Sequence, residues 1–242
     1  MIDALSEWLK HLNTWRTDVS WRAIIVFFTV SVLVAAPFNL GYADTWLQST
    51  FPSTPLSDWT FLPAALGPTI GAIIARRLDP RVRMDMTIMG VQRGPNVLVA
   101  ILPVVAFAFF GGVGWLLPVV ALVYALGEEF GWRGYLADAT HSLSSAARYT
   151  LTALLWWPWH LRFETTFDWI GFPLIVLASS WILGHAAKES RSVLVAAAMH
   201  SSIILLTVNG PPGNDLLVAG AVTLGGWILI GIVFPARNKS AI

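Results

Sequence analysis

The stretch YALGEEFGWRGYL, from Tyr124 to Leu136, places two adjacent glutamates at the end of one of the most apolar parts of the chain. The residues before them, from Val119 to Leu126, have the composition of a membrane-spanning helix. A charged side chain inside a span costs on the order of 2.5–3.5 kcal/mol and usually marks function. Glu128 and Glu129 therefore need an explanation, and Arg133 follows Glu129 at a spacing of one helical turn.

The composition of the whole chain is that of a membrane protein. Of 242 residues, 56% are hydrophobic and 12% are charged, and the mean hydropathy is +0.66. Soluble domains carry about 25% charged residues. A net charge of +1 without a basic run gives no reason to expect nucleic-acid binding. The absence of cysteine excludes disulfides, thiolate metal ligands and a cysteine nucleophile.

Eight apolar segments are long enough to cross a bilayer, which takes roughly 17–25 residues per helix. We therefore predict an all-α fold, a polytopic membrane bundle of eight transmembrane helices. The expected spans are residues 21–38, 60–76, 95–111, 113–132, 146–162, 170–187, 192–209 and 215–234. The segment from Asn39 to Asp58 has no basic residue and is rich in Pro, Ser and Thr, so we expect an outer loop there.

The basic residues follow the positive-inside pattern of membrane proteins. With eight spans, all of the 15 Lys and Arg residues except Arg162 fall on one side of the membrane, and both termini are expected in the cytoplasm. The residues on the cytoplasmic side are Lys10, Arg16, Arg22, Arg76, Arg77, Arg81, Arg83, Arg93, Arg133, Arg148, Lys188, Arg191, Arg237 and Lys239.

The start of the chain has a different pattern. Apolar residues recur every three or four positions between Ile2 and Val19, and Trp8 and Trp15 share the apolar face. This spacing predicts an amphipathic helix that lies on the inner membrane surface. The predicted organisation is therefore an interfacial helix at residues 1–20, followed by a membrane-embedded domain at residues 21–242.

Four ionisable residues in the predicted spans are candidates for chemistry, namely Glu128 and Glu129 in the fourth, His160 in the fifth and His200 in the seventh. At a rise of about 1.5 Å per residue, Glu128, His160 and His200 reach similar depths in the cytoplasmic half of the membrane. Three helices thus place a carboxylate and two imidazoles in one layer. The spacing does not show whether these side chains face each other.

The two glutamates are expected to differ in role, because adjacent helical positions point about 100° apart. Glu129 and Arg133 lie on one helix face, where an ion pair can form. Glu128 has no such partner in the sequence, and a buried carboxylate without a partner tends to hold a proton. We therefore predict that Glu128 is the general base that activates a water, supported by the Glu129–Arg133 pair.

His160 and His200 have two candidate roles. They would stabilise the oxyanion that forms when water attacks a carbonyl, or protonate the leaving amine. Alternatively, Glu128, His160 and His200 would bind a metal ion such as zinc, which lowers the pKa of a bound water. The sequence contains neither the H-E-x-x-H helix of zincins nor the G-x-S-x-G elbow of serine hydrolases.

The stretch EEFGWR, from Glu128 to Arg133, resembles the E-E-x-x-x-R signature of the CPBP intramembrane proteases. This family includes type II CAAX prenyl endopeptidases and Abi proteins linked to bacteriocin self-immunity. An aromatic residue four positions before a His, as in Trp156 and His160, is similar to the second family motif, and His200 is similar to the third. The catalytic residues that the resemblance implies are Glu128, Glu129, Arg133, His160 and His200.

The resemblance implies a peptidase that cleaves near the cytoplasmic face of a membrane, with the plasma membrane of a prokaryote as the expected location. Its substrate would be a membrane-associated peptide or a lipidated protein, such as a prenylated CAAX protein. One position departs from the family pattern. The family has Asn four residues after the last His, expected to help hold the oxyanion, whereas this chain has Ile204. Ser201 and Ser202 are candidate replacements.

Other functions stay open. A non-catalytic, bacteriocin-immunity-type protein of the same fold is supported by Ile204. A proton- or cation-coupled transporter would be expected to contain an inverted repeat with broken helices, and the sequence shows no such repeat.

Each candidate residue also has a structural explanation. Glu128, Glu129 and Arg133 could be an ion-pair cluster that caps the fourth span near the interface. His160 could belong to an aromatic belt, and His200 could be a hydrogen-bonded core histidine. The order of the motifs and their shared depth favour catalysis.

Overall fold

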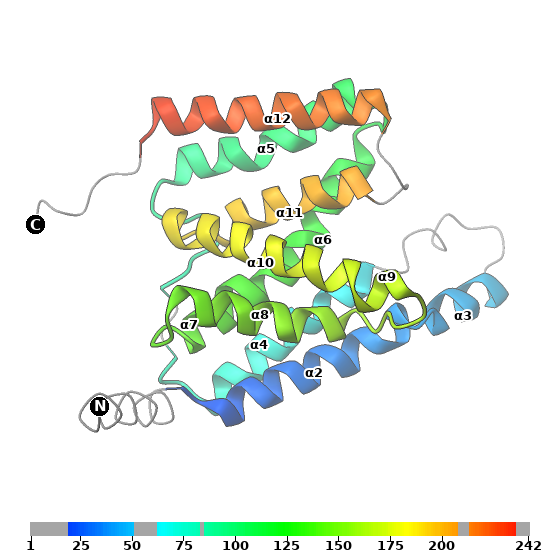
Figure 1. Ribbon diagram of the computed structural model, residues 1–242, viewed down its shortest axis with the longest axis vertical. Coiled ribbons are helices and arrows are strands. Elements are labelled where there is room, and N and C mark those ends of the chain that lie inside the picture. Colours follow the sequence, from blue (N-terminus) through cyan, green and yellow to red (C-terminus); the bar gives the residue numbers. More distant parts are fainter. Residues whose placement is uncertain (1–18, 51–61, 83–84, 208–212, 236–242) are drawn as a thin grey trace, which may run out of the picture. The chain divides into compact units, whose positions relative to one another are not determined.

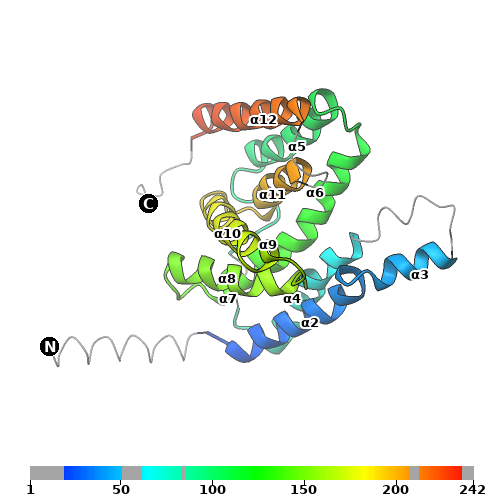
Figure 2. The same cartoon turned by 45° about the vertical axis from the view of Figure 1, so that its right-hand side comes forward.

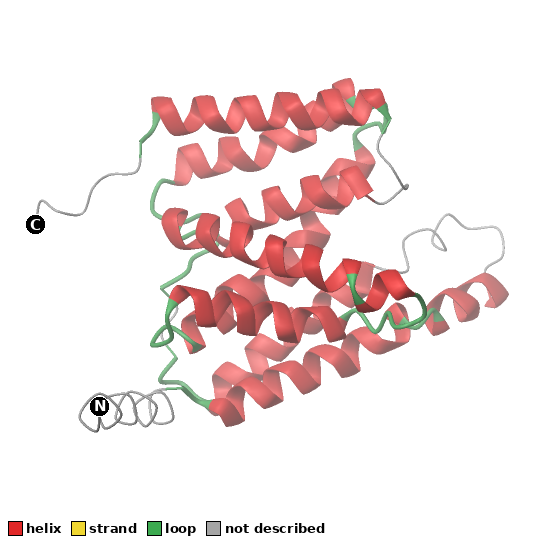
Figure 3. Cartoon of the chain, in the orientation of Figure 1, coloured by secondary structure: helices red, strands yellow, loops and turns green. Residues whose placement is uncertain are grey.

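The computed structural model describes residues 19–50, 62–82, 85–207 and 213–235. In this part of the chain the regular elements are helices, and the β pairing is one isolated parallel bridge between Thr87 and Ser192 (Figure 3). The predicted all-α class is confirmed. The interfacial helix predicted at residues 1–20 lies outside the described residues except for its last two positions, and it stays a prediction.

Each predicted span corresponds to a helix whose ends differ by a few residues from the expected ones (Figure 1). The long helices are α2 (Trp21–Asn39), α4 (Leu66–Leu78), α5 (Arg93–Phe110), α6 (Leu116–Glu129), α8 (Ser145–Trp159), α10 (Gly171–Ser190), α11 (Val193–Thr207) and α12 (Asn214–Val233). The short elements are α3 (Tyr42–Thr50), η2 (Leu62–Ala65), the π-helical η3 (Phe130–Tyr135), α7 (Leu136–Ala139) and α9 (Thr166–Trp169).

The helix α3 corrects the loop expected from Asn39 to Asp58. Its sequence, YADTWLQST, contains neither proline nor glycine. The proline residues that suggested a loop, Pro52 and Pro55, come after the helix has ended. The loop prediction was wrong over Tyr42–Thr50 because one composition was averaged over two different segments.

Among the described residues, four segments are long and apolar enough to cross a bilayer, namely α2, α5, α9 with α10, and α12. The helix α11 is also apolar but has 15 residues, which span about 22 Å of a hydrocarbon core roughly 30 Å thick. Large apolar side chains are exposed on the long helices, and Leu174 of α10 and Ile232 of α12 are 62% and 71% exposed. Surfaces of this kind suit lipid rather than water. The chain is a helical membrane protein.

The helices form two compact units. The first unit comprises residues up to Met84 and Tyr135–Trp181, and in it α2 packs along α4. Gly67 and Gly71 of α4 make this contact close. A Cβ on Gly71 would lie 2.5 Å from Ser31 Oγ and 2.6 Å from the Phe27 carbonyl oxygen. Small residues four apart allow membrane helices to approach in this way.

Trp159 fastens the end of α8 to α2 within the same unit. Its indole Nε1 donates to the Ser31 carbonyl at 3.1 Å, and Asn39 Nδ2 donates to the Trp159 carbonyl at 2.9 Å. At the other end of α8, Ser144 Oγ caps the helix by accepting from the Ala147 amide. The next residue after Trp159 is His160, so the bonds of Trp159 fix the backbone from which that imidazole extends.

The second unit comprises Asp85–Gly134 and residues from Ile182 onward. In it α11 packs against α5 and α6, and α12 lies along α5 (Figure 1 and Figure 2). The buried alanines Ala196, Ala197 and Ala198 point in different directions around α11 and keep the helix narrow there. The second unit carries the EEFGWR stretch and His200, whereas the first unit carries His160.

Candidate active site

The glutamate pair lies where the α-helix changes into a π-helix. The helix α6 ends at Glu129, and η3 continues directly from Phe130 to Tyr135. π-Helical turns are rare and occur frequently at functional sites. The sequence agrees with an irregular turn here, because it contains Gly131 and Gly134 and glycine is a weak helix former.

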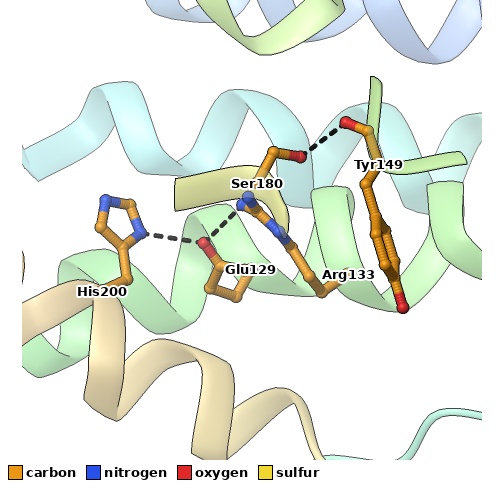
Figure 4. Close-up of polar contacts among 5 residues, drawn as sticks. All are labelled: Glu129, Arg133, Tyr149, Ser180 and His200. Carbon is orange, nitrogen blue, oxygen red and sulfur yellow. Dashed lines mark hydrogen bonds and ion pairs between the residues drawn. The ribbon is translucent and has the colours of Figure 1, made fainter. Parts of the chain in front are cut away.

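Glu129 accepts two hydrogen bonds at one carboxylate oxygen. Arg133 Nη1 donates to Glu129 Oε1 at 2.8 Å, and His200 Nδ1 lies 2.9 Å from the same oxygen (Figure 4). Glu129 is 0% exposed and Arg133 is 2% exposed. The ion pair expected from the spacing is therefore present, and it is buried. Deep burial argues against an ion-pair cluster that only caps the helix at the interface.

The bond to Glu129 defines the state of His200. An ionised carboxylate only accepts hydrogen bonds, so Nδ1 carries a proton and Nε2 is the basic nitrogen of the neutral ring. A carboxylate bonded in this way fixes both the tautomer and the orientation of a catalytic histidine. Depth in the membrane predicts that His200 lies in one layer with Glu128, and this contact joins His200 to Glu129, 71 residues earlier in the chain.

Glu128 is 1% exposed and is the neighbour of Glu129 in the last turn of α6. The described residues of the second unit contain no group of three His, Asp or Glu side chains that could hold a metal ion. Glu129 Oε1 already accepts from Arg133 and His200. The side chains of this unit alone therefore do not fit a zinc site, and the predicted metal set depends on His160 of the first unit.

His160 follows α8, and its ring lies among aromatic side chains. The ring centroids of Trp156, Trp159 and Phe172 are 5.7, 5.0 and 4.8 Å from that of His160. His160 Nδ1 lies 2.8 Å from the Trp156 carbonyl oxygen. A carbonyl only accepts, so Nδ1 carries the proton and Nε2 is the basic nitrogen of the neutral ring. The aromatic neighbours fit a belt residue, but the Trp156 bond also gives the ring one orientation and one tautomer.

The backbone directly after His160 adopts an unusual conformation. Leu161 has a φ of 55°, and its amide donates to the Pro158 carbonyl at 3.1 Å. Left-handed backbone is uncommon outside glycine, and such strained residues cluster at functional sites. Nothing in the sequence predicts this conformation at a leucine, although Pro158 marks the end of the helix.

Ile204 belongs to an apolar cluster. It packs against buried core residues, which are Phe107, Ala121, Leu205 and Ala219. The hydroxyls of Ser201 and Ser202 both donate to the Ala198 carbonyl, at 2.8 and 3.0 Å. A hydroxyl has one hydrogen to donate. In this conformation neither serine replaces the donor that an asparagine at position 204 would provide.

The comparison with protein families gives a match. Residues 110–206 match the family model described as type II CAAX prenyl endopeptidase Rce1-like. The comparisons with curated proteins and with solved structures gave no match. The matched segment contains Glu128, Glu129, Arg133, His160 and His200, which are the residues that the sequence analysis singled out. This match supports the CPBP family of CAAX proteases, which the sequence motifs resemble.

Proposed function

We propose that this protein is an intramembrane endopeptidase that hydrolyses a peptide bond near the cytoplasmic face of the membrane. The observation that carries the proposal is the buried carboxylate of Glu129, which binds Arg133 and His200 beside Glu128. Burying an ion pair costs free energy unless its own attraction and further hydrogen bonds offset the loss of water. The cluster lies in the segment that matches a protease family.

In the proposed reaction, Glu128 takes a proton from a water molecule as the water oxygen attacks the peptide carbonyl carbon. This attack produces a tetrahedral intermediate with a negatively charged oxygen. The C–N bond then breaks, and the proton on Glu128 passes to the departing nitrogen. The second proton of the water passes from the new carboxyl group to the amine, so the products are a carboxylate and a protonated amino terminus.

The two histidines have different proposed roles. In its protonated form, with Nδ1–H bonded to the Glu129 carboxylate, His200 donates from Nε2–H to the oxyanion. His160, whose neutral ring is basic at Nε2, accepts the second hydrogen of the attacking water and orients it toward the carbonyl. Arg133 donates to Glu129 and holds its carboxylate in place.

The proposed substrate is a membrane-associated peptide or a lipidated protein, with a prenylated CAAX protein as its specific form. The proposal includes eight membrane crossings, both termini in the cytoplasm, and the plasma membrane of a prokaryote. It also includes an interfacial helix at residues 1–20 and a membrane domain at residues 21–242. The agreement of the eight predicted spans with helices supports this topology.

Two alternatives predict different results. If Glu128, His160 and His200 bind zinc, a chelator abolishes cleavage and added zinc restores it. If the protein is a non-catalytic relative, as the apolar setting of Ile204 favours, the wild-type protein cleaves no substrate and Glu128→Ala leaves the biological phenotype intact.

The proposal is tested with purified protein in liposomes that contain membrane-borne peptides ending in a CAAX sequence, with and without a prenyl group. Mass spectrometry should find one cut with the wild-type protein and none with Glu128→Ala or His160→Ala, at unchanged helix content. Glu189→Ala removes an exposed glutamate on α10 and should cleave normally. Cleavage at the wild-type rate by both site variants would exclude the assigned roles.

A further inference from the structure

The segment from Thr87 to Val91, which we name the α4–α5 loop, is held by backbone hydrogen bonds to the turn between α10 and α11. The Thr87 amide donates to the Arg191 carbonyl at 3.1 Å, and the Val193 amide donates to the Thr87 carbonyl at 3.0 Å. The Leu194 amide donates to the Ile88 carbonyl at 3.0 Å. Backbone hydrogen bonds thus attach the loop to the second unit.

Side chains complete this attachment. Ser192 Oγ donates to the Ile88 carbonyl at 2.9 Å, and Nδ2 of the buried Asn96 donates to the Met89 carbonyl at 2.8 Å. Gly90 has a φ of 69°, and a Cβ there would lie 2.5 Å from Asn96 Nδ2 and 2.7 Å from Ser192 Cβ. Only glycine fits this conformation and this space. The loop therefore has one defined shape.

This shape exposes apolar side chains. Ile88, Met89 and Val91 are 49%, 47% and 67% exposed. Apolar surface in water costs roughly 25 cal/mol per Å². Because the backbone is fixed, these side chains cannot turn inward to avoid that cost. A fixed apolar tip indicates that another apolar phase covers it.

The position of the loop identifies that phase. The candidate span α5 begins at Arg93, two residues after the loop, and the candidate span formed by α9 and α10 ends at Ser190, which bonds to it. The loop consequently lies at the level where these spans leave the bilayer. Exposed cations occur at this end, namely Arg93, Lys188 and Arg191, together with the exposed acids Asp85 and Glu189. Cations beside an apolar tip match anionic phospholipid headgroups above acyl chains.

We propose that the α4–α5 loop is a lipid anchor that inserts Ile88, Met89 and Val91 into the leaflet at the basic end of the helices. Arg93 and Arg191 bind the phosphates of anionic phospholipids around the insertion. Under the predicted topology this is the cytoplasmic leaflet.

The anchor has a structural consequence for the candidate site. Met86, directly before the loop, is buried in a cluster with Ala187, Val193 and Ala196, and Phe130 of η3 packs against that cluster. Fixing the loop in the leaflet therefore holds the π-helical segment at a constant depth. Lipid binding by the loop does not depend on peptidase activity.

The absence of native cysteine allows a direct test. Single variants Met89→Cys and Val91→Cys carry a nitroxide label in liposomes of phosphatidylcholine and phosphatidylglycerol, and collision rates with oxygen and with a water-soluble nickel complex give the depth of each label. Asp85→Cys, exposed in the same unit, is the aqueous control, and Leu229→Cys, 60% exposed on α12, is the lipid control.

Labels at positions 89 and 91 should collide more often with oxygen than with the nickel complex. They should lie deeper in the bilayer than the label at position 85. Nickel collisions as frequent as those at Asp85 would overturn the proposal. Dipolar broadening between labels would also overturn the proposal, because it would show that a second copy of the chain covers the loop. Ile88→Cys repeats the test if either variant folds poorly.

A second comparison tests the cations. With Arg93→Gln and Arg191→Gln together, the Met89→Cys label should lie nearer the surface in phosphatidylglycerol-containing liposomes and stay unchanged in phosphatidylcholine alone. If the label at position 89 lies at the same depth in both lipids, with and without the arginines, the loop does not bind anionic headgroups through Arg93 and Arg191.

Discussion

Glu129 shares one carboxylate oxygen between a guanidinium and an imidazole, so the contributions of these three residues depend on one another. If Glu129 acts by orienting His200, it has little to contribute once His200 has been removed. Residues in one hydrogen-bond network usually show such non-additive effects. Glu128, by contrast, has its own role as the proposed base.

A double-mutant cycle on cleavage measures this dependence. Glu129→Gln and His200→Ala should each lower kcat on the order of 10²–10⁴-fold, and the double variant should be little worse than His200→Ala. The rates are measured at saturating substrate with protein of unchanged helix content. Losses that multiply in the double variant would show that Glu129 acts independently of His200.

Ile204 is expected to stabilise the second unit through its apolar cluster. Ile204→Asn would place an amide among apolar side chains and should lower the free energy of unfolding by about 1–3 kcal/mol. Ile204→Val keeps the apolar character and should cost about 0.5–1.5 kcal/mol. Thermal unfolding in detergent compares the two variants. An asparagine variant as stable as the valine variant would mean that position 204 faces a polar space.

At the scale of single elements, the α4–α5 loop depends on one glycine. Gly90→Ala should destabilise the second unit, because residue 90 has a positive φ and crowds Asn96 and Ser192. Gly94→Ala is the matched control: a Cβ there meets nothing within 4 Å, in the first turn of α5. It should be neutral or stabilising by up to about 1 kcal/mol. An equal fall in the unfolding temperature of both variants would contradict this account of the loop.

The long helices could be predicted because runs of apolar residues have few other structures available in a membrane. The local departures from regular helix could not be predicted. The π-helical η3 and the left-handed Leu161 leave no periodic pattern in the sequence. The short helix α3 was missed because its composition is mixed.

The candidate site shows the same division between local and distant contacts. The ion pair of Glu129 and Arg133 follows from a spacing of four residues, although the helix between them is partly π-helical. The contact of His200 with Glu129 joins residues 71 positions apart, and depth along a helix does not specify such a partner. Motif order led to the candidate residues, whereas the contact between Glu129 and His200 required the structure.

At the scale of the whole molecule, acid should lower the stability of the folded protein by protonating Asp79. Arg81 donates two side-chain hydrogen bonds to this carboxylate, at 2.8 and 3.0 Å. These bonds, followed by one from Ser20, hold the pKa of Asp79 well below its ordinary value. A lowered folded-state pKa stabilises the fold above the unfolded-state value of about 4, and this stabilisation disappears as the pH falls below it.

Thermal unfolding between about pH 6 and pH 3 checks this expectation. The wild-type protein should lose stability over the acidic part of the range, and Asp79→Asn should show a smaller loss because its side chain does not titrate. The same pH dependence in both proteins would mean that other carboxyl groups control acid stability.

The central claim is that Glu128, His160 and His200 act on one water molecule. An experimental structure in a lipid nanodisc, at a resolution that shows ordered water, measures it directly. The account predicts that the Glu128 carboxylate lies within about 2.6–3.2 Å of Nε2 of each histidine, or one bridging water away. A Glu128 that faces lipid, or imidazoles beyond the reach of one water, would contradict it.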